Sequence, residues 1–483
     1  GSALAGNRSF KDYVADRFNY RNVVILMKNG CIYCGVTEDL SKSDIIPDAL
    51  TNAKMINPNV CRIKHNNDFS DMFEAEVIQK LALITNELDI KSSKGKNYAS
   101  YESIITVGDT DYNAKITSET ELFGGKKKMR SVDGKYLLGP IDEIKKIKAA
   151  NDTNVSEIDV NQMEIEKRVP LDLSVFFSMA MYRMVAKIGF EWYCAKNKVM
   201  SKIDDFTPII DFITRSNGGK VVSIVSNPEI YALFNNMVNY GSHALLSYVS
   251  KDNSVNVIIN LFGIAIYNVR VCDKPLDGCK YNVLFQELTL DAKHICFSDT
   301  DIENLKEHFI NSFEPTNIGD GLTAMIPKDM TDKTLKYKLM YVTNYELFFE
   351  KLNLIDEPTQ EVITLILNNI QSLLQESAIT IRGLKRFVKE HWKHFEQGIR
   401  LNPKGTNKKS IFMFYMLFII GQSNGKIKNI HDLYTVIKDK FSSDTINISD
   451  EMSNKLHEEM LSNESHSELM TKGAKIIESW SFE

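Results

Sequence analysis

The residues best suited to chemistry are three cysteines and a histidine near the start of the chain. Two residues separate Cys31 from Cys34, and Cys61 and His65 follow further along. Two thiolates at the first spacing can bind one side of a tetrahedral ion, and a cysteine and a histidine returned by a hairpin can complete the other side. The pattern predicts one structural zinc ion, which would stabilise a small unit with little core of its own.

Two other interpretations of these residues stay open. The three thiols could be ordinary buried cysteines beside a surface histidine. The Cys31–Cys34 pair could instead be a redox pair of the thioredoxin type, although no strand–helix–strand pattern surrounds it. Because cysteine pairs at this spacing are usually metal or redox sites, the sequence favours zinc.

The elements that must position the zinc ligands can be predicted from the flanking residues. A strand over 22–27 leads into the first cysteine pair, and Ile45–Ile46 lies on a second short strand that Pro47 ends. A helix follows over 71–89, because apolar residues recur there at helical spacing. These residues are Met72, Phe73, Val77, Leu81 and Ile84. The predicted order is knuckle, strand, loop, second knuckle and helix.

This order resembles the zinc-bound branch of the HNH (His-Asn-His) endonucleases, whose core is a ββα-metal finger. The resemblance covers residues 28–80. It is carried by a CxxCG knuckle, a strand ending in Ile-Ile-Pro, an asparagine before the second knuckle, an Asn-Asn-x-Phe run and a helical glutamate. In this chain these are Cys31–Gly35, Ser41–Pro47, Asn59, His65–Phe69 and Glu74. The helix that ends in Lys187-Ile-Gly-Phe-Glu191 also resembles a segment that accompanies this module in some members of the family.

The resemblance implies hydrolysis of nucleic acid phosphodiesters with one divalent ion, Mg²⁺ or Mn²⁺. In such a finger a histidine at the end of the first strand takes a proton from water, and the acidic residue before it binds the ion together with a helix residue. In this chain the acidic–His pair falls on Ser43 and Asp44, and His65 is assigned to zinc. The resemblance then leaves Asp44, Asn59 and Asn67 as the candidate catalytic residues.

The departure at Ser43 and Asp44 leaves three functions open. A solvated aspartate titrates near about 3.9 and is a weak base at neutral pH. The chain could be an active nuclease with an unusual site, in which Asp44 and Asn67 bind the metal ion. It could be a degenerate finger that binds nucleic acid or a protein without cutting. It could also be a zinc-stabilised assembly module within a larger defence or regulatory complex.

The composition is that of an ordinary globular protein without a global nucleic-acid signature. The 483 residues are 43% hydrophobic and 25% charged, with a net charge of −5, so any polyanion site must be a local patch. The seven cysteines are an odd number, which favours a reducing, cytoplasmic location over a disulfide framework. The apolar run at 411–420 is too short to span a bilayer and predicts a buried helix, so no membrane association is expected.

A basic stripe is the best candidate for a local polyanion patch. It lies on a predicted helix over 381–395 and shares one helical face. Its members are Arg382, Lys385, Arg386, Lys389 and Lys393. A solvated helix face is the alternative explanation. As partners the sequence suggests nucleic acid, DNA before RNA, and a partner subunit or a second copy of the chain is also open.

The predicted fold class is α+β, with four segments along the chain. These are a zinc-bound HNH-like finger over 8–95, a β-rich extension and linker over 96–168, a helix with an antiparallel sheet over 169–298, and a helical domain over 299–483. The third segment has a long helix over 171–196, followed by alternating runs typical of strands. These runs lie at 220–225, 243–249, 255–261, 264–271 and 282–288.

Overall fold

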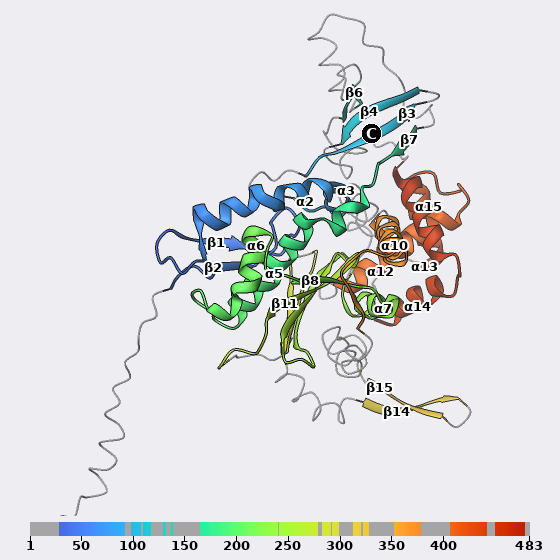
Figure 1. The fold of residues 1–483 in the computed structure, drawn as a ribbon. Helices are drawn as coiled ribbons and strands as arrows, with labels where there is room; N and C mark the ends of the chain where they lie inside the picture. The colour runs from blue at the N-terminus through green and yellow to red at the C-terminus, as the bar shows by residue number, and fades with distance from the viewer. Residues whose placement is uncertain are drawn as a thin grey trace, which may run out of the picture.

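The computed structural model has both helices and antiparallel sheets, so the predicted α+β class is confirmed (Figure 1). It describes residues 29–91, 98–107, 110–116, 129–131, 137–138, 165–239, 241–278, 283–290, 292–298, 313–319, 322–327, 352–377, 406–441 and 450–478. The strand predicted over 22–27 and the basic stripe on 381–395 lie outside these residues.

The N-terminal finger has the predicted order of knuckle, hairpin and helix. Its elements are β1 (Leu40–Asp44), β2 (Ile56–Cys61), the π-helical turns η1 (Arg62–Asn67) and η2 (Ser70–Glu74), and the helices α2 (Ala75–Lys80) and α3 (Ala82–Glu87). The strands β1 and β2 pair antiparallel, with a register shift between Ser41 and Ser43. The hairpin thereby returns Cys61 towards the first cysteine pair.

Two local expectations for the finger need correction. The strand β1 ends at Asp44, so Ile45 and Ile46 lie just beyond it, although the Ile45 amide still donates to the carbonyl of Met55 at 2.9 Å. The predicted helix over 71–89 is divided at Leu81, whose backbone leaves the helical region (φ −89, ψ 6). Its predicted apolar stripe is buried except for Met72, which is 47% exposed.

A long helix, α5 (Met179–Lys196), is packed against a seven-stranded antiparallel sheet. The helix starts later than predicted because the Ser178 hydroxyl accepts a hydrogen bond from the Met181 amide and caps it. The sheet has the order β13-β12-β9-β10-β11-β8-β16, with one strand at each of the five predicted runs and with β13 and β16 outside those runs. Their bounds are β8 (Val222–Val225), β9 (His243–Val249), β10 (Val255–Leu261), β11 (Ala265–Cys272), β12 (Leu284–Leu288), β13 (His294–Ser298) and β16 (Leu354–Ile355).

Further helices surround this sheet and α5. They are the 3-10 turns η4 (Leu173–Phe177) and η5 (Asp204–Phe206), and the helices α6 (Thr207–Arg215), α7 (Pro228–Met237) and α10 (Gln360–Ser377). The sheet separates two apolar clusters: Ile258 and Phe285 pack with α7, whereas Val257 and Leu284 pack with α5. The alternation of side chains along each strand explains why neighbouring residues enter different clusters.

The finger shares one hydrophobic core with α5 and the sheet. A single cluster of buried side chains contains Ile46 and Phe73 from the finger, Phe190 from α5 and Val269 from β11. Figure 1 accordingly shows α5 lying between the finger and the sheet, and α5 contacts β2 and η2 on one side and β10 and β11 on the other. The segments 8–95 and 169–298 are therefore joined by their core, while the division into four segments stays a prediction.

The remaining elements form two further sheets and a group of C-terminal helices. A five-stranded sheet has the order β6-β5-β4-β3-β7, which agrees with the predicted β-rich extension, and β14 and β15 form a hairpin. Their bounds are β3 (Tyr101–Val107), β4 (Thr110–Ile116), β5 (Met129–Ser131), β6 (Leu137–Leu138), β7 (Ile165–Arg168), β14 (Phe313–Gly319) and β15 (Leu322–Pro327). The segment predicted as helical from 299 therefore contains strands, where Thr316, Thr323 and Ile326 favour extended backbone.

The C-terminal helices pack around one apolar helix. They are α12 (Thr406–Gln422), α13 (Ile430–Phe441), α14 (Asp450–Leu461) and α15 (His466–Glu478). The predicted buried helix at 411–420 is confirmed, since Phe412, Tyr415 and Leu417 of α12 are fully buried against α13–α15. Among the described residues, no helix combines the length and the apolarity needed to cross a bilayer.

Candidate metal centre

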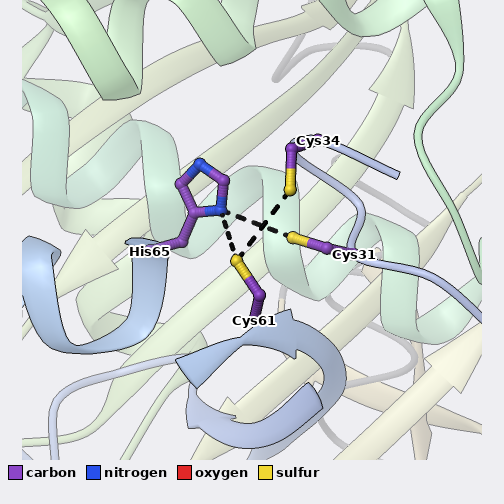
Figure 2. A group of neighbouring side chains, drawn as sticks. All are labelled: Cys31, Cys34, Cys61 and His65. Atoms are coloured by element: carbon purple, nitrogen blue, oxygen red, sulfur yellow. Dashed lines mark hydrogen bonds between the residues drawn. The ribbon is translucent and has the colours of Figure 1, made fainter. Parts of the chain in front are cut away.

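The four predicted ligands meet at one point between the hairpin and η1 (Figure 2). Their ligand atoms all lie within 4.8 Å of one another. The Sγ atoms of Cys34 and Cys61 are 3.9 Å apart, and the Nδ1 atom of His65 lies 3.5 Å from the Cys31 Sγ and 2.9 Å from the Cys61 Sγ. In the part of the chain that is described, no other group of three or more His, Cys, Asp or Glu side chains is arranged this closely.

These separations fit a small tetrahedral ion. Zinc holds sulfur at about 2.3 Å and nitrogen at about 2.0 Å, so ligand atoms around it lie about 3.6–3.8 Å apart. The Cys34–Cys61 and Cys31–His65 separations are close to this value. The Cys61–His65 separation, at 2.9 Å, is shorter than this value. The donor set, with three sulfurs and one nitrogen, is also one that structural zinc sites use.

The protonation of the four groups agrees with a metal-binding role. Burial, followed by the proximity of the Cys31 and Cys34 thiols, raises the pKa of Cys61 to about 12. Burial also raises the pKa of Cys31, so the thiols of Cys31 and Cys61 resist becoming thiolates unless a cation compensates their charge. Burial lowers the pKa of His65 to about 4, so its imidazole is neutral at physiological pH and can offer a lone pair.

Local backbone structure holds each ligand in place. The first knuckle is closed by two hydrogen bonds, from the Gly35 amide to the Cys31 carbonyl and from the Cys31 amide to the Val36 carbonyl, both at 2.7 Å. Gly35 has a φ of +78, a conformation that a residue without a side chain adopts at no steric cost. His65 lies on η1, which begins directly after Cys61. Three residues separate these two ligands, one more than separate Cys31 from Cys34, and the wide π-helical turn accommodates the extra residue.

The metal centre is anchored to the core through Tyr33, which lies between the first two ligands. Its ring centroid lies 5.0 Å from those of His65 and Phe69, and 5.2 Å from that of Phe190 on α5. The tyrosine is 2% exposed. Ring contacts at these distances stabilise a buried cluster by more than the burial of their surface area alone. The contacts of Tyr33 attach the first knuckle to helix α5.

Behind the metal centre lies a second group of side chains, which we call the buried polar cluster: Tyr33, Ser43, Glu74, Lys187 and Glu191. The carboxylate of Glu191 accepts hydrogen bonds from the hydroxyls of Tyr33 and Ser43, each at 2.9 Å. The Lys187 Nζ forms an ion pair with Glu74 Oε1 at 2.7 Å and lies 3.9 Å from Glu191 Oε2. The side chains of Lys187 and Glu191 are 2% and 0% exposed.

The charges of the buried polar cluster depend on one another. Burial disfavours the charged form of Lys187, but the negative charges of Glu191 and Glu74 outweigh it and raise the pKa of this amine. Burial is also the main effect on Glu191 and raises the pKa of its carboxyl to about 7, although Lys187 and the two hydroxyls oppose this shift. At neutral pH the cluster therefore keeps a charged lysine, while Glu191 is near its titration midpoint.

The three candidate catalytic residues lie in different environments. The Asp44 side chain, at the end of β1, is 27% exposed, and its Oδ1 atom faces the Lys54 Nζ at 3.5 Å. Asn59 is 7% exposed, and its backbone bonds to Asn57 Oδ1 and to the Ile32 amide. Asn67 is exposed at the end of η1. No hydrogen bond or ion pair joins the three within the described part of the chain, so their joint role stays a prediction.

Sequence reasoning missed the role of Lys187 and Glu191. Both residues carry charge within the long helix α5, whose middle is otherwise apolar and buried. Their spacing of i and i+4 places them on one face. Two charged residues of opposite sign inside such a helix are a signal for a buried ion pair, because unpaired charges are rarely buried. The signal does not reveal the partners, which come from the finger.

Comparison with known proteins adds no assignment: no family model, curated protein or solved structure matches this chain. Membership of the HNH family therefore stays a proposal that depends on the residues of the finger. The nucleic-acid-binding stripe from Arg382 to Lys393 lies outside the described residues, and its role also stays a prediction.

Replacing Glu191 with glutamine is expected to change how stability depends on pH. The pKa of this carboxyl is raised from 4.5 to about 7 on folding, so its contribution to stability is complete below pH 4.5 and is lost as the pH rises through 7. Relative to Glu191→Gln, the wild type should lose about 1 kcal/mol of unfolding free energy per pH unit across this window.

The measurement is urea unfolding of both zinc-saturated proteins at several pH values, so that proton-linked metal release cancels in the difference. A difference that stays constant with pH would show that Glu191 keeps an ordinary pKa in the folded protein.

Proposed function

We propose that this protein is a zinc-stabilised finger protein of the HNH type, directed at nucleic acid phosphodiesters. The observation that carries the proposal is the convergence of Cys31, Cys34, Cys61 and His65 at the junction of a hairpin and a helix. The ion is inferred to be zinc from the donor set and the separations. The sequence between the ligands resembles the HNH finger rather than a redox pair.

Of the activities open to such a finger, binding without efficient cleavage is favoured by the state of Ser43. This residue stands at the position of the acidic metal ligand in the family, and it is fully buried. Its hydroxyl donates a hydrogen bond to the Glu191 carboxylate, so Ser43 is part of the buried polar cluster. The neighbouring Asp44, which stands where the family has its histidine base, faces the Lys54 Nζ at 3.5 Å.

Plasmid nicking tests this proposal against the nuclease alternative. We expect the zinc-loaded chain to show no nicking above background with Mg²⁺ or Mn²⁺, because loss of a general base typically costs about 10²–10⁴ in rate. Asp44→His restores the family's base without altering buried Ser43, so nicking gained by this variant would show that the general base is the group the natural chain lacks. Replacing Ser43 with glutamate as well, to restore the family's acidic residue, would place a second carboxylate beside Glu191. The single substitution is therefore the sharper test.

The nicking experiment has a control variant, and one result would contradict the proposal. Glu76→Ala removes an exposed acid from the same finger and should leave all activities unchanged. Divalent-ion-dependent nicking by the natural chain would establish the nuclease with Asp44 as a metal ligand if Asp44→Ala abolishes the nicking and Glu76→Ala does not. The proposal of binding without cleavage would then be wrong.

We further expect weak, salt-sensitive DNA binding through the basic stripe. Lys385→Glu combined with Lys389→Glu should weaken binding and flatten the dependence of affinity on salt, because fewer counterions are released. Fluorescence anisotropy with duplex DNA at several salt concentrations measures both effects. The same probe as RNA tests the preference for DNA.

The control variant carries the same change of charge at another place in the chain. Lys426→Glu with Lys428→Glu reverses two exposed lysines after α12. If both double variants lose affinity equally, binding follows net charge, and the stripe is not the site. If neither changes affinity, the DNA contact lies on another part of the chain.

A further inference from the structure

The space between the end of β1 and η2 is lined by oxygen atoms and is filled by the ammonium of Lys187. The Nζ atom lies 2.6 Å from the Asp44 carbonyl oxygen, 2.7 Å from Glu74 Oε1 and 3.9 Å from Glu191 Oε2. Two of these oxygens belong to carboxylates and one to the backbone. Such a set of oxygens is typical of a divalent cation site, but here the cation belongs to the protein.

This placement conflicts with the divalent ion that an HNH-type finger implies. That ion would lie beside the end of β1, where Ser43 and Asp44 stand for the family's acidic–His pair. The Ser43 hydroxyl is bonded to Glu191, whose carboxylate also faces Lys187. A divalent ion in this space would meet the Lys187 ammonium, whose side chain is 2% exposed and is held by Glu74 and by the Asp44 carbonyl. The residues present therefore do not fit the ion.

We propose that Lys187 is a tethered cation that takes the place of the divalent ion, so that this finger operates without one. The proposal rests on the proposed HNH-type function. Its physical basis is the compensation of charge, since two buried carboxylates need a nearby positive charge in a medium of low dielectric. A lysine supplied by α5 provides that charge permanently, whereas an exchangeable ion would provide it only when bound.

The same arrangement joins the finger to the sheet-bearing part of the chain. Lys187 contacts β1 and η2, and Glu191 contacts the first knuckle, β1 and, through its carbonyl oxygen, the Asn57 amide of β2. Two residues one helical turn apart therefore bind the first knuckle, both strands of the hairpin and η2. A tethered cation in this position couples the geometry of the finger to helix α5, which an independent zinc finger would not require.

Binding of Mn²⁺ to the zinc-loaded full-length chain tests the proposal, with bound Mn²⁺ measured by electron paramagnetic resonance. Lys187→Ala removes the ammonium and leaves the oxygens. Lys54→Ala is the matched control, because it removes an exposed lysine that faces Asp44 from the solvent side. We expect no stoichiometric Mn²⁺ binding to the wild type or to Lys54→Ala. We expect one Mn²⁺ per chain for Lys187→Ala, bound at least about tenfold more tightly.

Two results would overturn the proposal. One is stoichiometric Mn²⁺ binding by the wild type that Glu74→Gln abolishes, which would place a divalent ion beside Lys187. The other is a folded Lys187→Ala protein that binds Mn²⁺ no better than the wild type, which would show that the space is no cation site.

If Lys187→Ala does not fold, the comparison of wild type with Glu74→Gln decides: Glu74-dependent Mn²⁺ binding overturns the proposal, and its absence supports it. Zinc content and DNA binding are measured separately on the wild type. Their failure would contradict the proposed function while leaving the Mn²⁺ result unaffected.

Discussion

Replacing Cys34 with serine is expected to release the metal and to unfold the finger. Structural zinc contributes about 10–16 kcal/mol of apparent binding free energy in small finger units, and the loss of one thiolate removes most of it. The remaining ligands, Cys31, Cys61 and His65, cannot complete a tetrahedral site. Metal analysis should fall from one zinc per chain to less than about a tenth, and limited proteolysis should cut within residues 29–91.

The matched control is Cys296→Ser, which alters an exposed cysteine on β13, away from the four ligands. It should keep full zinc content and the resistance to protease. A purified wild type with almost no zinc would contradict the assignment of a zinc centre. Full zinc retention in Cys34→Ser would instead show that the ion is held by other residues.

Replacing Glu191 with alanine is the second substitution with a large expected effect. It removes the acceptor for the Tyr33 and Ser43 hydroxyls and leaves the buried Lys187 ammonium with Glu74 alone. Breaking a buried ion pair by deleting one partner typically costs about 3–5 kcal/mol, because an uncompensated charge stays in the interior. We expect a loss of this size in the free energy of unfolding, measured by urea denaturation of the zinc-saturated protein.

Glu76→Ala provides the comparison, because Glu76 is an exposed glutamate on helix α2. Its substitution should change stability by less than about 0.5 kcal/mol, as for most surface positions. If Glu191→Ala costs no more than Glu76→Ala, the buried polar cluster does not stabilise the fold. If the loss is large, a parallel reduction in zinc affinity would show that Tyr33 transmits it to the metal centre.

Local sequence patterns determined much of the fold. The spacing of Cys31, Cys34, Cys61 and His65 predicted the ligand set, because a knuckle and a hairpin turn fix the relative positions of residues near one another in sequence. Apolar alternation predicted β9 and β10 at their observed bounds, and an uninterrupted apolar run predicted α12 as a buried helix. In each case the information lies within a short window of the chain.

Only the tertiary structure decided what lies beside the candidate catalytic positions. Ser43 and Glu191 are 148 residues apart in sequence, and Lys187 and Asp44 are 143 apart, yet each pair is hydrogen-bonded. Nothing in the local pattern of β1 shows that Ser43 is buried, since a serine on a hairpin strand could equally face solvent. That choice depends on α5 packing across the hairpin, and the packing is set by the shared core. The sequence alone therefore identified the four side chains that converge as a possible metal centre, and the fold alone identified the lysine and glutamate that occupy the adjoining space.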